Sequence, residues 1–199
     1  MVHTLLKEWR TTVLLVVSTG VLTFDHYHQS QLTDWERGAI FLLVPLLTLL
    51  GLGYRPARFG FKPGNWRRGL QLTLGAILIM TPILWLATRG ADFRGYYGGV
   101  WARGGWLGTL AWTVSDLFGW EFFFRGFLLF ALLPIAGDWA LLLQAIPFTM
   151  AHFGKPELET WSCIIGGTLF AWVARETDSF FYPFLIHTYV AFFTAWLVR

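Results

Sequence analysis

Hydrophobic residues form seven long runs along the chain, with short polar segments between them. A bilayer core of about 30 Å needs roughly 20 apolar residues per helix, and fewer where neighbouring helices shield the ends. The runs therefore predict an all-α bundle of membrane-spanning helices. The fourth run is the longest, which predicts one strongly tilted helix or two helices with a break near Gly119. The predicted spans are residues 11–24, 38–54, 70–88, 106–134, 139–153, 160–174 and 179–198, seven in all or eight if the fourth is broken.

The polar segments differ in charge, and this difference predicts an orientation. Segment 55–69 has five bases and no acid, which is typical of a loop or short helix at an anionic cytoplasmic membrane face. Segment 25–37 is net acidic, so it is expected outside, with the N-terminus in the cytoplasm. The glycine-rich segment 89–105 is expected to be an interfacial loop. The order of the spans places it outside, although its arginines are more typical of the cytoplasmic side.

The composition agrees with a membrane protein. The chain has 199 residues, 55% of them hydrophobic and 14% charged, against roughly 25% charged in a soluble domain. These values exclude a disordered chain, a collagen-like fibre and a disulfide scaffold. No repeat or shift in composition divides the chain, so residues 1–199 are expected to form one integral-membrane domain. The net charge is +3 without a basic stripe, which predicts membrane lipid and no nucleic acid as a partner.

Charged residues within the apolar runs are the first candidates for function. A charge in a membrane span costs at least about 2.5–3.5 kcal/mol, so each needs a reason. Asp116, Glu121 and Arg125 all lie in the fourth run. Glu121 and Arg125 are four residues apart, so they can neutralise each other on a helix, and this pairing is the purely structural interpretation. Against it, a pair buried only for packing usually gains nothing over apolar residues.

Two histidines add a possible chemistry to this pair. His152 ends the fifth run and His187 lies in the last. A lone histidine in an apolar segment is more often a satisfied interior group than a ligand. Two histidines with Glu121 form a more specific set, because imidazole and carboxylate can hold a divalent metal and activate water. Zinc is the first candidate for that metal, with His152, His187 and Glu121 as its ligands.

Three segments together resemble the CAAX-protease and bacteriocin-processing (CPBP, or ABI) family of intramembrane metalloproteases. The family shows an EExxxR helix, an FxxxH helix and a later HxxxN-type helix, in this order. The resemblance covers about residues 106–195, which are expected to form the catalytic core. The matching segments are Trp120-Glu121-Phe-Phe-Phe-Arg125, Phe148-Thr-Met-Ala-His152 and His187-Thr-Tyr-Val-Ala191.

The resemblance implies roles for the polar residues, and two departures complicate them. It implies Glu121 as the general base, Arg125 as the residue that orients it, and the two histidines as metal ligands or water-positioning groups. The family's leading glutamate is Trp120 in this chain, and the residue at its final amide is Ala191. Either Glu121 takes over the base role, or a loop carrying Glu157 and Glu159 folds back to supply the missing carboxylate.

The preferred interpretation is an intramembrane metallopeptidase, in a bacterial cell membrane, that cleaves a peptide or C-terminal segment of a membrane-associated substrate. The two departures favour a second hypothesis, a non-catalytic family member that acts as a membrane binding or immunity protein. A third hypothesis is a small transporter lined by Asp116, Glu121, Arg125 and the histidines. Against this hypothesis, the sequence shows no internal repeat of the kind usual in secondary transporters.

Overall fold

A computed structural model describes residues 9–102 and 104–199, and within these residues all regular structure is helical. This confirms the prediction of an all-α chain. Short 3₁₀ turns occur at η1 (Pro56–Phe59) and η3 (Gly137–Trp139), and a π-helical segment, η2, at Phe122–Leu128. The α-helices are α2 (Trp9–His28), α3 (Asp34–Gly51), α4 (Trp66–Ala87), α5 (Ala91–Ala102), α6 (Gly105–Glu121), α7 (Leu129–Ala136), α8 (Ala140–Leu143), α9 (Ala145–Met150), α10 (Glu157–Thr177) and α11 (Phe181–Leu197).

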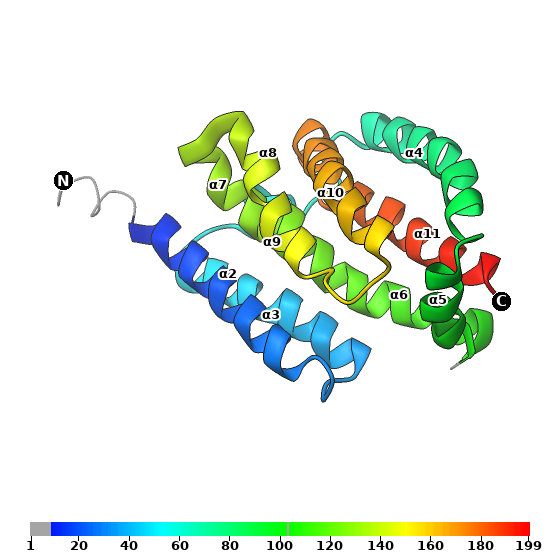
Figure 1. Ribbon diagram of the computed structural model, residues 1–199. Coiled ribbons are helices and arrows are strands. Elements are labelled where there is room, and N and C mark those ends of the chain that lie inside the picture. Colours follow the sequence, from blue (N-terminus) through cyan, green and yellow to red (C-terminus); the bar gives the residue numbers. More distant parts are fainter. Residues whose placement is uncertain (1–8, 103) are drawn as a thin grey trace.

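Helix α6 lies at the centre of the bundle (Figure 1). On one side it packs against α3, which is itself paired with α2, and on the other side against α11. Helix α11 also contacts α4 and α10, and α10 packs along α9. Residues from three distant parts of the sequence therefore meet around the C-terminal half of α6.

Each predicted run is helical, but the connections differ from the expectation. The fourth run continues through Gly119 without a break and changes to the π-helical segment only at Phe122. The fifth run consists of the short helices α8 and α9. Segment 89–105 was wrongly expected to be a loop. It forms α5, because Phe93 and Tyr97, four residues apart, bury their rings against Ala195 of α11.

Two helices among the described residues are long and apolar enough to cross a membrane, namely Trp66–Ala87 and the continuous stretch Gly105–Met150. Helix α11 is apolar but shorter. Only 11% of the apolar window of α4 is buried within the protein, so most of this helix presents hydrophobic side chains outwards. An apolar surface of that extent needs a partner or lipid to cover it.

Two glycines allow α3 and α6 to cross at backbone contact. A Cβ atom added at Gly38 would meet the backbone carbonyl of Ser115, and one at Gly119 would meet the carbonyl of Gly38. Backbone atoms cannot move aside as a flexible side chain can. This crossing holds Arg37 of α3 beside Asp116 of α6.

We expect Gly119→Ala to lower the free energy of unfolding by about 1–3 kcal/mol, because the added methyl group overpacks the crossing. Gly20→Ala is the matched control, since a Cβ at Gly20 of α2 meets nothing within 4 Å. The measurement is denaturant or thermal unfolding of the purified protein in detergent. Equal stability of the two variants would contradict the close approach of α3 and α6.

Candidate active site

Glu121 and Arg125 form a buried ion pair where α6 changes into the π-helical segment. Both side chains are fully buried, and Arg125 Nη1 lies 3.3 Å from Glu121 Oε1. Single π-helical turns are rare and frequently occur at functional sites. Here the segment keeps Glu121 and Arg125 on the same side of the helix. The pairing predicted from their spacing is present, and neither charge is left without a counter-charge.

His187 of α11 shares the same carboxylate. Its Nδ1 lies 2.6 Å from Glu121 Oε1. An ionised carboxylate only accepts hydrogen bonds, so Nδ1 must be the protonated ring nitrogen and donate. In the neutral imidazole, Nε2 then carries the free lone pair. Glu121 thus fixes both the position and the tautomer of His187.

His152 reaches the same tautomer by a different contact. It follows α9, and its Nδ1 lies 2.7 Å from the backbone carbonyl of Phe148. A carbonyl also only accepts, so Nδ1 donates and Nε2 is again the free nitrogen. The rings of His152 and His187 are 6.3 Å apart at an interplanar angle of 24°. The structure therefore brings the four predicted residues together, with two imidazoles side by side.

These residues lie in two layers around a cavity of about 420 Å³. The two histidines line the cavity, whereas Glu121 and Arg125 lie behind its wall. Trp120 and Ala191, the two departures from the family motifs, also line it. The other polar side chains in the wall are Gln29, Asp34, Arg37, Tyr96, Thr109, Asp116 and Lys155.

Glu121 and Arg125, the inner layer of the site, are held in place by helix α10 and by aromatic rings. Arg125 Nη2 lies 3.5 Å from the carbonyl of Gly167, and its guanidinium lies over the Phe148 ring at 3.9 Å. Gln144 donates to the same carbonyl at 2.9 Å. A Cβ at Gly167 would press on the Phe148 ring, whereas one at Gly166 would meet nothing. The close approach of α9 and α10 therefore requires a glycine at position 167 but not at position 166.

Glu157 and Glu159 do not line the cavity. They lie in the first turn of α10, rather than in a loop that folds back. Glu159 accepts hydrogen bonds from Tyr97 and Lys155, and Glu157 accepts one from Trp161. Both carboxylates thus have other partners.

Arg37 could not be recognised from the sequence as part of the site, because it lies in a segment that is net acidic and expected outside. In the structure, Arg37 forms two hydrogen bonds to Asp25, at 2.5 and 2.8 Å, and lies 3.6 Å from Asp116. Lys155 was missed for a similar reason, because it is a lone base in a short polar connection. Only the packing of α3 and α9 around α6 brings these two bases to the cavity.

The described residues contain no group of three His, Cys, Asp or Glu side chains that could hold a metal ion. Glu121, the expected third ligand, directs Oε1 at His187 and Arg125 instead. The ligand set predicted for zinc thus does not fit this arrangement.

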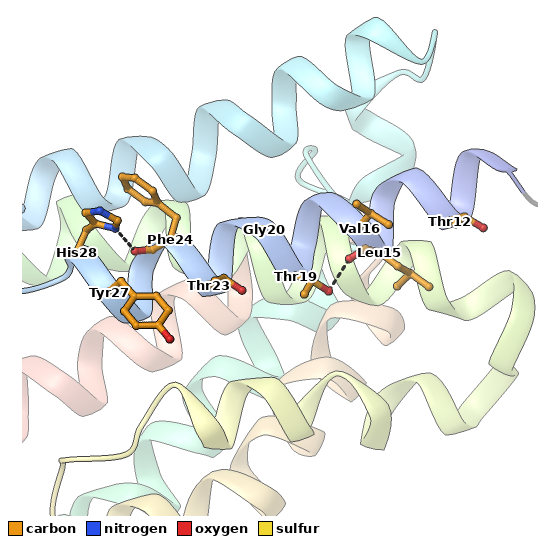
Figure 2. Close-up of a pocket in the computed structure, with 9 residues that line it drawn as sticks. All are labelled: Thr12, Leu15, Val16, Thr19, Gly20, Thr23, Phe24, Tyr27 and His28. Atoms are coloured by element: carbon orange, nitrogen blue, oxygen red, sulfur yellow. Dashed lines mark hydrogen bonds between the residues drawn. The ribbon is translucent and has the colours of Figure 1, made fainter.

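A second, larger hollow of about 730 Å³ runs along one face of α2 (Figure 2). Its lining residues, from Thr12 to His28, belong to this single helix. His28 there bonds the Phe24 carbonyl through Nδ1 at 2.9 Å and stacks on the Phe24 ring. None of the candidate residues lies in this hollow, which is a groove on the outer surface and not a reaction chamber.

The fold and the site define a helical bundle with a Glu–Arg–His–His cluster behind and beside one polar cavity. Residues 101–193 match the family model Rce1-like, described as type II CAAX prenyl endopeptidase Rce1-like. Over these residues the chain matches this CAAX-protease (CPBP/ABI) family, as its motifs predicted. The family is a protease family whose members are membrane proteins. Comparisons with curated proteins and with solved structures found no match.

Removal of the Arg125 charge tests whether Glu121 and Arg125 form a buried ion pair. We expect Arg125→Met to lower the free energy of unfolding by about 3–5 kcal/mol, because it leaves the Glu121 carboxylate buried without a counter-charge. Adding Glu121→Gln should restore part of this loss. Arg175→Met is the matched control and should cost under about 1 kcal/mol, because Arg175 and its partner Asp138 are exposed. Similar losses for Arg125→Met and Arg175→Met would contradict the buried pair.

Proposed function

We propose that this chain is an intramembrane peptidase that hydrolyses an amide bond in a membrane-associated peptide or protein. The observation that carries the proposal is the pair of imidazoles on the cavity wall, each with Nδ1 donating to a fixed acceptor. The match to a protease family supports it. An amide bond within a bilayer can be hydrolysed only where the protein supplies water and charge stabilisation, and this polar cavity would supply both.

His187 is the general base of this proposal. Its Nε2 takes a proton from a water molecule in the cavity while the water oxygen attacks the carbonyl carbon of the peptide. Glu121 then stabilises the imidazolium through Nδ1, by the logic of a Ser-His-Asp triad. The bond between carbonyl carbon and nitrogen breaks, and Nε2 returns the proton to the leaving amine. His152 Nε2 accepts a hydrogen bond from the second water proton and so positions the water.

This assignment changes the role of Glu121. The sequence predicted that Glu121 itself takes the proton from water, but its side chain is fully buried and lies outside the cavity wall. It acts as a positioning residue for His187, and Arg125 holds it in turn. The chain thereby replaces a carboxylate base with an imidazole base that a carboxylate supports.

The membrane arrangement is part of the same proposal. The seven apolar runs would cross the bilayer, with the basic segment 55–69 and the N-terminus on the cytoplasmic side of a bacterial cell membrane. Outward-facing side chains such as Leu47, Leu78 and Ile165, which are 64%, 76% and 69% exposed, would face lipid. The cavity would then lie toward the external ends of α3 and α6.

A second candidate function is peptide binding without cleavage. Trp120 supports it, because a buried indole lies edge-on to His152 where the family has a carboxylate. Glu121 also supports it, because its Oε1 accepts hydrogen bonds from Arg125 and His187 and is therefore not available to take a proton from water. Such a protein would act as a membrane binding or immunity protein.

An activity assay separates the two candidates. The substrate is an internally quenched, farnesylated peptide that ends in a C-a-a-X sequence, added to the protein in proteoliposomes. We expect His187→Ala and His152→Ala each to lower kcat/KM by at least about 100-fold, the usual contribution of general acid–base groups. His26→Ala, on the exposed side of α2, is the control and should leave it unchanged. Binding of the peptide by the wild type without cleavage would contradict the peptidase and favour the binding protein.

Metal analysis tests the zinc predicted from the sequence. Purified wild type, His152→Ala and His187→Ala would be compared by elemental analysis after identical preparation. A zinc site formed by these residues predicts about one metal ion per wild-type chain and a clear loss in both variants. Equal metal content in the three proteins would remove the zinc site, and the imidazole mechanism would stand without it.

A further inference from the structure

Helix α6 has three buried polar atoms, in residues that line the cavity, without a hydrogen-bond partner in the described part of the chain. They are Thr109 Oγ1, Asp116 Oδ1 and Trp120 Nε1. The three residues are only 1%, 4% and 4% exposed. A buried polar atom without a partner costs about 1–3 kcal/mol, and native proteins retain few of them. Three such atoms on one wall of one cavity call for a functional explanation.

These three residues, termed the α6 row, are aligned on one face of the helix. At 100° per residue, positions 109, 116 and 120 lie within about 40° of each other. Eleven residues separate Thr109 from Trp120. At 1.5 Å per residue the row is thus about 16 Å long, the length of about five residues of extended peptide. The row ends at Trp120, next to His152.

The chemistry of the α6 row matches a peptide backbone. The Trp120 indole N–H can donate to a peptide carbonyl, Asp116 Oδ1 can accept a peptide N–H, and the Thr109 hydroxyl can do either. Arg37 keeps Asp116 in place, because Nη1 lies 3.6 Å from Oδ2 and its guanidinium lies 4.6 Å from the Trp120 ring. A lipid acyl chain offers no such groups, and a phosphate would be repelled by Asp116.

We propose that the α6 row binds an extended segment of about five substrate residues by its backbone and leads it to the two histidines. The cleavage of that segment rests on the proposed function, whereas its binding does not. Alternating donors and acceptors give the peptide its direction and register. The side chains of the peptide would point away from α6 into the rest of the cavity.

The test replaces each polar side chain with an apolar one. Thr109→Val, Asp116→Leu and Trp120→Phe would be compared with the wild type for the Kd of a dye-labelled, farnesylated C-a-a-X peptide in nanodiscs and for KM and kcat of its cleavage. We expect each variant to raise Kd and KM about tenfold, with little change in kcat. Thr113→Val is the control on the same helix, because the Thr113 hydroxyl is bonded to the Thr109 carbonyl. Asp25→Asn is the control for the Arg37 contact, because Asp25 binds Arg37 outside the cavity.

A second readout needs no substrate. Thr109→Val removes an unpaired buried polar atom at nearly constant shape, so it should unfold at the wild-type temperature or above it. A lower unfolding temperature of this variant would show that the Thr109 hydroxyl serves the fold. Unchanged Kd and KM in all three row variants would overturn the proposal. Wild-type binding without cleavage, lost in the row variants, would overturn the peptidase alone. A wild type that binds neither the farnesylated nor the unprenylated peptide would overturn both.

Discussion

The arrangement of the site depends on one buried carboxylate. Glu121 is fully buried, and such a charge is tolerated only with a counter-charge and hydrogen bonds. Arg125 supplies the charge from the next turn, and His187 supplies a hydrogen bond from α11. The contact with His187 ties α11 to α6, and the contact of Arg125 with Gly167 ties α10 to the same point. One ionised group thereby fixes three helices and the orientation of an imidazole.

The two sides of α6 have different tasks. Its C-terminal end, with the π-helical segment, holds the Glu121–Arg125 ion pair and stabilises the bundle. The wall toward the cavity keeps three polar atoms unpaired and so lowers stability. Such a division is expected where a protein gives up stability for a binding or catalytic surface. Gly38 and Gly119 make the division possible, because the close crossing of α3 brings Arg37 to the open wall.

Part of this could be predicted from the sequence. Charges and histidines in apolar runs are rare enough that Glu121, Arg125, His152 and His187 could be selected, and their spacing predicted the Glu121–Arg125 pair. The layering of the site could not be predicted, since the side on which Glu121 lies depends on how α6 rotates against α10 and α11. Asp116 was a candidate because of its charge in an apolar run, but its contact with Arg37 of the distant helix α3 in the cavity wall could not be predicted. Segment 89–105 was misjudged because glycines masked the spacing of Phe93 and Tyr97.

The central claim is that Glu121 holds His187 with a bare Nε2 toward the cavity. It is tested most directly by ¹⁵N solid-state NMR of histidine-labelled protein in lipid, with His187 assigned by its loss in His187→Ala. The account predicts a neutral His187 with a protonated Nδ1 and a bare Nε2 in the wild type. It also predicts that Glu121→Leu, which removes the acceptor, changes this signal. A proton on Nε2 with Nδ1 bare, or a signal unchanged in Glu121→Leu, would contradict it.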